Sequence, residues 1–193
     1  MQVLKSHQLH QVLQVVLGDD EQGRADRRKA EKRASLFRLR EPIPDGIFTS
    51  AGFVVESHPY YDAAKRGVNF DGMLAALNAA VAGTVVVLHA CCHNPTGYDI
   101  TSAQWDQVVA VVKAKGLVPF LDMAYQGFGY GLTEDGAAVQ KFVAAGLTCF
   151  VSTSFSKSFS LYGERVGALS VLCESKEEAD RVLSQLKIVI RTN

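Results

Sequence analysis

The sequence predicts an α/β fold in which helices cover both faces of a mainly parallel sheet, giving three layers (α/β/α). Residues 84–90 (TVVVLHA) form a continuous apolar, β-branched run, which is typical of a strand buried on both faces. Strand-like segments alternate along the chain with helical segments of about ten to fifteen residues. Ligands bind to such sheets beyond the carboxyl ends of the strands. The polar residues next to those ends are therefore the candidate site.

The first elements have clear start and stop signals. Residues 52–57 form a short apolar segment typical of a strand, and residues 69–82 carry apolar residues at helical spacing until Gly83. After the strand at 84–90, Thr101 and Gln104 form a capping box. In this motif the hydroxyl accepts the backbone N–H of the glutamine, and the glutamine side chain accepts the backbone N–H of the threonine. We therefore expect a helix to begin directly after Thr101.

The later elements continue the alternation. The helix behind Thr101 ends before Gly116, and residues 117–123 form the next strand, although Pro119 is unfavourable inside a strand. Residues 134–145 are helical and stop at Gly146. The remaining expected elements are strands at residues 148–152 and 166–173 and a final helix opened by a second capping box, Ser175 to Glu178.

Composition excludes several classes of protein. The chain of 193 residues is 48% hydrophobic, with 20 basic and 20 acidic residues, so its formal net charge is zero. A neutral total gives no general attraction for nucleic acid or anionic membranes. No run of apolar residues is long enough to span a bilayer. The four cysteines, two of them adjacent, do not form a disulfide framework. We expect a cytoplasmic protein with neither a nucleic-acid nor a membrane partner.

The charge is unevenly distributed. Between residues 19 and 41, 14 of 23 positions are charged, eight basic and six acidic. This density predicts a solvated helix or a disordered segment, and the interleaved acids oppose the alternative of a basic helix that binds nucleic acid. Pro42 and Pro44, followed by Asp45 and Gly46, are expected to break any helix. We therefore divide the chain into a charge-rich segment, residues 1–46, and a domain, residues 47–193.

Four polar clusters adjoin the predicted strands, at residues 91–97, 122–127, 152–157 and 162–167. Each of their residues, taken alone, is more often structural than catalytic.

A zinc site is one interpretation of the first cluster, because thiolates and imidazoles are zinc ligands. His89, Cys91, Cys92 and His93 lie within five residues. Alternate residues of an extended segment point to opposite faces, so the four would not converge on one ion without a tight turn. We expect packing residues here and no metal.

Two other patterns are incomplete. Ser154 and Lys157 fit the Ser-x-x-Lys pattern of serine acyl-enzymes, but neither Ser-Asp-Asn nor Lys-Thr-Gly occurs in the chain. Gly127, Gly129 and Gly131 suggest a phosphate cradle, but the sixth position of the G-x-G-x-x-G pattern is not glycine. A flexible loop is the simpler interpretation of these glycines.

Taken together, the clusters resemble a known family. The segments CCHNPTG, LDMAYQGFGYGLTED and VSTSFSKSFSLYGERVGALSV occur in this order. They resemble class I aminotransferases that use pyridoxal phosphate, the aspartate and aromatic amino-acid aminotransferases, and the last segment resembles the bacterial aromatic branch more closely. The resemblance runs from about Ile47 to Asn193, and it implies part of the large domain of a fold-type I enzyme.

The resemblance also implies roles for individual residues. Lys157 would form a Schiff base with the cofactor aldehyde and then act as base and acid in the proton shift. Asp122 would pair with the protonated pyridine nitrogen and keep the ring an electron sink. Tyr125 and Asn94 would hydrogen-bond the phenolic oxygen of the ring. The remaining implied cofactor ligands are Ser154 and Arg165, which would hold the phosphate.

The implied activity is transamination between an aromatic amino acid, or aspartate, and 2-oxoglutarate, in a homodimer. Members of the family are longer than this chain. They carry a glycine-rich phosphate loop and a ring-stacking aromatic residue upstream, and an arginine for the substrate carboxylate in a C-terminal small domain, none of which is found here. We therefore expect a partial copy. The alternative is a truncated, non-catalytic fragment that only binds pyridoxal phosphate or dimerises with a homologue.

Overall fold

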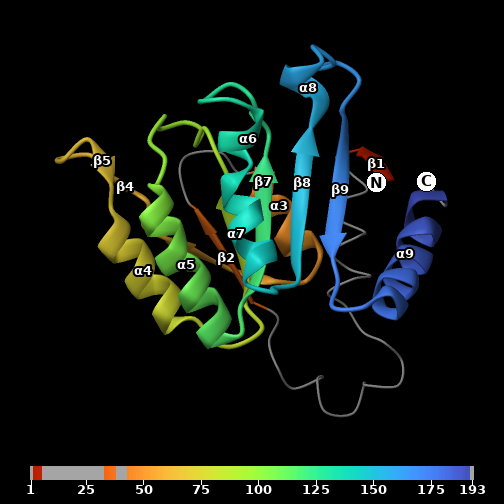
Figure 1. Ribbon diagram of the computed structural model, residues 1–193, viewed down its shortest axis with the longest axis horizontal. Helices are drawn as coiled ribbons and strands as arrows, with labels where there is room; N and C mark the ends of the chain where they lie inside the picture. Colours follow the sequence, from red (N-terminus) through yellow and green to blue (C-terminus); the bar gives the residue numbers. More distant parts are fainter. Residues whose placement is uncertain (1, 6–32, 38–42, 192–193) are drawn as a thin grey trace.

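A computed structural model describes the backbone of residues 2–5, 33–37 and 43–191 and the side chains of residues 47–189 (Figure 1). The strands are β1 (Gln2–Lys5), β2 (Arg33–Phe37), β3 (Val54–His58), β4 (Tyr61–Asp62), β5 (Gly67–Val68), β6 (Val85–His89), β7 (Val118–Met123), β8 (Cys149–Ser154) and β9 (Val166–Leu172). The helices are α3 (Ile43–Ser50), α4 (Phe70–Ala79), α5 (Ser102–Lys115), α6 (Leu132–Asp135), α7 (Ala137–Ala144), α8 (Phe155–Ser158) and α9 (Lys176–Arg191).

Seven of these strands form one sheet in the order β1-β9-β8-β7-β6-β2-β3, and β4 and β5 form a separate hairpin. Strands β3, β2, β6, β7 and β8 are mutually parallel. Strand β9 runs antiparallel to β8, and β1 runs antiparallel to β9. The mainly parallel sheet predicted from the sequence is confirmed.

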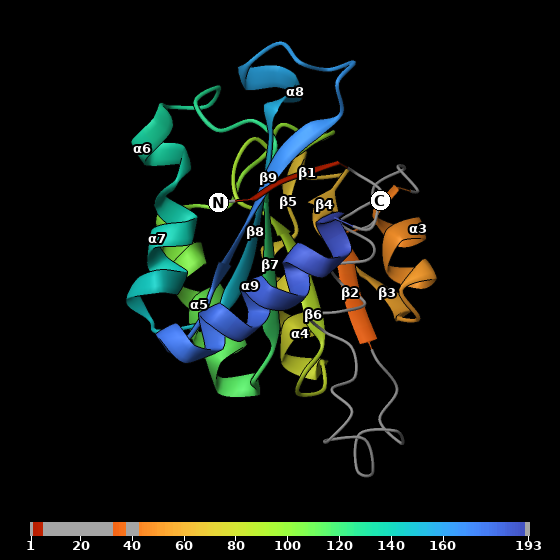
Figure 2. The ribbon, with the colours of Figure 1, turned by 90° about the vertical axis from the view of Figure 1, so that its right-hand side faces the viewer.

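Helices cover both faces of this sheet, as the edge-on view shows (Figure 2). Alternate residues of the strands serve the two faces, as the strand period requires. On one face, helices α4, α5 and α7 pack with Leu88 of β6 and Leu121 of β7. On the other face, helices α3 and α9 pack with Val87, Phe120 and Phe150. The three-layer α/β/α arrangement is therefore confirmed.

The predicted helix signals are present in the geometry. The Thr101 hydroxyl accepts the Gln104 N–H at 3.2 Å, and the Gln104 side chain accepts the Thr101 N–H at 2.8 Å. Gly116, just past α5, has φ of 61°, a left-handed conformation that glycine adopts without steric cost. At the start of α9, the Ser175 hydroxyl accepts the N–H of Glu178 at 3.1 Å.

Two predicted elements differ in detail. The helix expected at residues 134–145 is two helices, α6 and α7, separated by Gly136. The Leu132 carbonyl, which the N–H of Gly136 would need in a continuous helix, accepts the Gln126 side chain at 2.9 Å instead. Pro119 lies inside β7. The proline is tolerated there because the pairing of β7 with β8 begins only at the next residue, Phe120.

The expectations for the charge-rich segment are wrong where the structure describes it. Residues 33–37 (RASLF) form β2, a strand paired with both β3 and β6, rather than a solvated helix or a disordered stretch. The average charge of the whole segment conceals this short run, which holds a single charge. Residues 19–32 and 38–41 lie outside the described residues.

The expected helix break is wrong as well. Helix α3 begins at Ile43 and includes Pro44 and Gly46. Proline fits the first helical turn, because an N–H there has no intrahelical partner and the ring already fixes a helical φ. The division of the chain at residue 46 stays a prediction. In the described part of the chain, every helix is too short or too polar to cross a membrane.

Candidate functional site

The candidate site lies at the carboxyl ends of β6, β7 and β8, at the upper edge of the sheet in Figure 1. Residues at or near the carboxyl ends of these strands form a polar row, because His89 is paired with Asp122 and Asp122 with Ser152. The Ser152 hydroxyl donates a hydrogen bond of 3.0 Å to the Asp122 carboxylate. Burial lowers the pKa of His89, and the nearby carboxylates of Asp122 and Asp99 act in the opposite direction. The row thus holds a half-buried carboxylate between an imidazole and a hydroxyl.

Asn94 lies in the loop between β6 and α5. Its backbone N–H donates to Nδ1 of His89 at 3.4 Å, its peptide bond to Pro95 is cis, and its side chain is exposed. The Asp99 carboxylate accepts the N–H groups of Cys92 and His93, both at 2.7 Å. The two residues before Asn94 thus form a backbone turn that is held by the carboxylate of Asp99.

Tyr125 lies in the loop between β7 and α6. Asp135 accepts the N–H groups of Gly127, Gly129 and Tyr130 at 2.8, 3.0 and 2.9 Å. Burial alone would raise the pKa of Asp135, but these backbone donors outweigh it and hold the pKa below its usual value. The carboxylate therefore stays charged and acceptor-only, which suits its donors.

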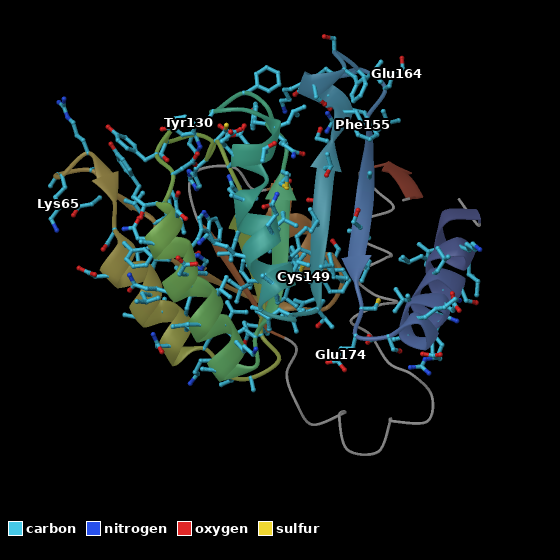
Figure 3. All side chains as sticks on the ribbon, in the orientation of Figure 1. Lys65, Tyr130, Cys149, Phe155, Glu164 and Glu174 are labelled. Atoms are coloured by element: carbon cyan, nitrogen blue, oxygen red, sulfur yellow. The ribbon has the colours of Figure 1, made fainter. Side chains whose placement is uncertain are left out.

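These two loops form the walls of an open hollow of about 500 Å³. Asn94 and Tyr125 both line it, together with Tyr130 at its rim. Figure 3 shows Tyr130 and Phe155 at the same edge of the sheet, well away from Glu174 at the opposite edge. The hollow is thus next to the start of α8.

Lys157 reaches this edge from α8, which follows β8 directly. Its Nζ lies 4.9 Å from the centroid of the Tyr125 ring and 5.4 Å from that of Tyr162. Ser154, at the end of β8, caps α8 by accepting the Ser156 N–H at 3.2 Å, and its own hydroxyl hydrogen remains available to donate. The structure therefore brings Lys157 and Tyr125 together.

Arg165 returns to this edge because β9 runs antiparallel to β8. Its guanidinium carbon lies 5.3 Å from the Tyr162 ring centroid, so Tyr162 contacts both cationic side chains. Strands β8 and β9 approach closely at Gly167: a Cβ there would lie 2.5 Å from the Thr153 carbonyl oxygen, so only glycine fits. Arg165 itself is exposed.

The thiols predicted as packing residues also converge. Among the residues with described side chains, ligand atoms of Cys91, Cys92 and Asp135 lie within 4.8 Å of one another, whereas the zinc interpretation required His89 and His93. Burial raises the pKa of Cys91 to about 12, which disfavours the thiolate that a metal needs. The Asp135 carboxylate already accepts three backbone donors. We assign this cluster to loop structure, and the expectation of no metal stays a prediction.

Sequence reasoning missed Asp99, Asp135 and Ser152. Asp99 lies in the loop before α5, and Asp135 is the last residue of α6. A signal for both existed in the backbone N–H groups of the neighbouring turns, which need acceptors. In the sequence, Ser152 is only the first residue of the polar cluster at residues 152–157. Its role follows from the register of β7 and β8, which the sequence does not state.

A family model for aminotransferase class I and II matches residues 45–193. The chain belongs to this family. The aminotransferase match covers the whole candidate site and begins within two residues of the boundary expected at residue 46.

Curated aminotransferases are similar in sequence over the same part of the chain. The aspartate aminotransferase of Pseudomonas aeruginosa is 64% identical over 147 residues, which are 76% of this chain and 37% of that protein. The aromatic-amino-acid aminotransferase of Escherichia coli K12 is 56% identical over the same length and shares of the two chains. This chain thus spans about a third of the length of these relatives.

A solved structure shows the same fold. The aromatic-amino-acid aminotransferase from Burkholderia pseudomallei, covalently bound to pyridoxal phosphate, matches with a TM-score of 0.87 and 55% identity. The match covers 98% of this chain and 46% of that one. It confirms the predictions of a fold-type I fold and of a partial copy, and the assignment to the large domain stays a prediction.

Proposed function

We propose that this chain binds pyridoxal 5'-phosphate and forms the cofactor-binding part of an aminotransferase. The observation that carries the proposal is the position of Lys157, whose amine lies 4.9 Å from the Tyr125 ring centroid, at the edge of the sheet where Asp122 is the penultimate residue of β7. A lysine, a phenol and a carboxylate from three separate segments meet there. These are the groups that a pyridine aldehyde requires.

The donor set fits the cofactor. When bound, the cofactor supplies an electron sink for the carbanion that forms at the substrate Cα. Asp122, already oriented by Ser152, holds a proton at the pyridine nitrogen by ion pairing. Tyr125 and Asn94, which line the same hollow, donate hydrogen bonds to the phenolic oxygen.

The remaining residues bind charge or move protons. Arg165, with a planar guanidinium, and Ser154, with a free hydroxyl hydrogen at the start of α8, bind the phosphate. Lys157 would be the covalent attachment point for the cofactor aldehyde; once the substrate amine had displaced it, its Nζ would take the proton from the substrate Cα as a base and deliver it as an acid at the other end of the 1,3 proton shift. Tyr162 keeps Lys157 and Arg165 in contact with one aromatic ring.

The substrates we propose are an aromatic amino acid or aspartate, with 2-oxoglutarate as the acceptor. The names of the relatives support both amino-acid classes, since the two quoted are an aspartate and an aromatic aminotransferase. We also propose a homodimer in the cytoplasm, on the strength of the family.

Reduction with borohydride tests the cofactor assignment. The chain is incubated with pyridoxal phosphate, reduced and analysed by mass spectrometry. We expect one stable adduct on Lys157, its complete loss in Lys157→Ala, and an unchanged yield in Lys176→Ala, which removes an exposed lysine of α9. Adducts spread over surface lysines, equal in the wild type and in Lys157→Ala, would sink the proposal.

The alternative is a chain that binds the cofactor without turnover or pairs with a homologue. Tyrosine or aspartate is added with 2-oxoglutarate, and formation of the 2-oxo acid and glutamate is followed. An adduct on Lys157 without turnover supports the alternative. Turnover that requires Lys157 supports the aminotransferase.

A further inference from the structure

Two carboxylates, those of Asp99 and Asp135, accept backbone N–H groups of the loops that form the walls of the hollow. Asp135 is buried, with 4% of its surface exposed, and accepts N–H groups of Gly127, Gly129 and Tyr130. These donors span the segment that follows Tyr125. One side chain thus fixes the backbone of the loop over several residues.

The second carboxylate does the same for the opposite wall. Each oxygen of Asp99 accepts one N–H, from Cys92 and His93, directly before Asn94. Cys92 has φ of 50°, a left-handed conformation that costs free energy for a residue other than glycine. Two hydrogen bonds to a charged acceptor offset that cost, because charge-assisted bonds are the stronger kind.

The two walls also contact each other. The Cys92 thiol donates to the Tyr125 carbonyl at 3.7 Å. A Cβ on Gly129 would lie 2.6 Å from the Asp135 carboxylate and 3.2 Å from the Cys92 sulfur, so the second loop passes close to both. A displacement of one loop must therefore also displace the other.

We propose that Asp99 and Asp135 are positioning residues, which hold the Asn94 and Tyr125 side chains in the geometry that binds the phenolic oxygen of the cofactor. This inference rests on the proposed function. Neither carboxylate acts on the reacting atoms. Their effect passes through the backbone of the two loops, and a misplacement of about 1 Å is enough to lose much of a positioned contact.

The test uses Asp135→Asn, which keeps the shape of the side chain but places an NH2 group against backbone donors. In the cofactor-free chain, we expect the amide hydrogens of Gly127, Gly129 and Tyr130 to exchange faster. With pyridoxal phosphate, we expect the dissociation constant to rise about 10-fold, as for other supporting residues. The pH midpoint of the cofactor absorbance band should also rise, because fewer hydrogen bonds reach the phenolic oxygen.

Matched variants separate positioning from folding. Asp180→Asn removes an exposed carboxylate of α9 and should change none of the three readouts. Gly129→Ala keeps both carboxylates but crowds Asp135 and Cys92, so it should shift all three in the same direction. Gly129→Ala carries the test if Asp135→Asn does not fold. Asp99→Asn is expected to accelerate exchange at Cys92 and His93 and to raise the same midpoint.

Faster exchange with an unchanged dissociation constant and midpoint would overturn the inference, since the carboxylates would then be structural only. Unchanged exchange would overturn it as well. A wild-type chain that does not bind pyridoxal phosphate would instead overturn the proposed function, and the exchange measurements would still decide whether the carboxylates hold the loops.

Discussion

The two halves of the candidate site are held in different ways. The anchored half comprises the loops at residues 91–99 and 124–131, in which two carboxylates accept five backbone N–H groups. The exposed half comprises residues 155–165, where Lys157 and Arg165 contact the ring of Tyr162, which is itself 63% exposed. The anchored half is preorganised, whereas we expect the exposed half to gain contacts only when a ligand binds.

Acidification should damage the anchored half most, because the described histidines lie in or beside it. Burial lowers the pKa of His58 to about 4 and that of His93 to about 3. A histidine with a lowered folded pKa binds fewer protons when folded, so its stability contribution is intact above about pH 6.5 and falls as the pH drops toward the folded pKa. Below that pH, each of these two histidines should lower the free energy of unfolding by about 1.4 kcal/mol per pH unit.

Urea unfolding between pH 6.5 and 5.0 measures this slope. His58→Gln should reduce the pH dependence of the free energy of unfolding by the contribution of one histidine. Amide exchange should accelerate at residues 91–99 before it does at residues 155–165. A free energy of unfolding that does not change over this interval would contradict the assignment of neutral, buried histidines.

The next largest effect is expected in the exposed half. Arg165→Ala should weaken the binding of pyridoxal phosphate about 10-fold or more, because it removes charged hydrogen bonds to the phosphate. Stability should change by less than about 0.5 kcal/mol, as for an exposed side chain. Absorbance titration measures the affinity, and pyridoxal without phosphate is the control ligand. An equal loss for both ligands would show that Arg165 does not bind the phosphate.

The smallest effect concerns the helix that follows the anchored half. Thr101→Ala removes the cap of α5 and should lower the free energy of unfolding by about 1 kcal/mol. Ser175→Ala makes the matching change at the start of α9. Neither should alter cofactor affinity. If Thr101→Ala weakened cofactor binding while Ser175→Ala did not, the anchored half would extend into α5.

The fold could be predicted from the sequence wherever a local signal was strong. The β-branched run at residues 84–90 gave β6, and the capping box at Thr101 gave α5 with its starting residue. Strand β2 could not be predicted, because its five residues pair with strands remote in the sequence and lie in a charge-rich segment. The interruption at Gly136 accompanies a hydrogen bond from the Gln126 side chain to the Leu132 carbonyl, which the helix pattern of residues 134–145 does not include.

Motifs in the sequence predicted candidate residues for the site, but they did not predict the residues that support the two loops. Lys157 and Asp122 were found because motifs at strand ends resemble a family. The carboxylates of Asp99 and Asp135 bind backbone rather than ligand, so no motif for ligand chemistry marks them. The convergence of Cys91 and Cys92 with Asp135, rather than with the histidines, depends on the left-handed turn at Cys92, which residue spacing alone does not reveal.

The antiparallel pairing of β8 and β9 has a consequence for the size of the ligand. The register fixes Ser154 opposite Gly167, so Lys157, in α8, and Arg165 lie on the one segment that connects these two strands. The distance between the amine and the guanidinium is therefore set by residues 158–164, independently of the strands that place Asp122 and Tyr125. A change in the length of the segment 158–164 would therefore alter the distance between the Lys157 amine and the Arg165 guanidinium, while Asp122 and Tyr125 would keep their positions.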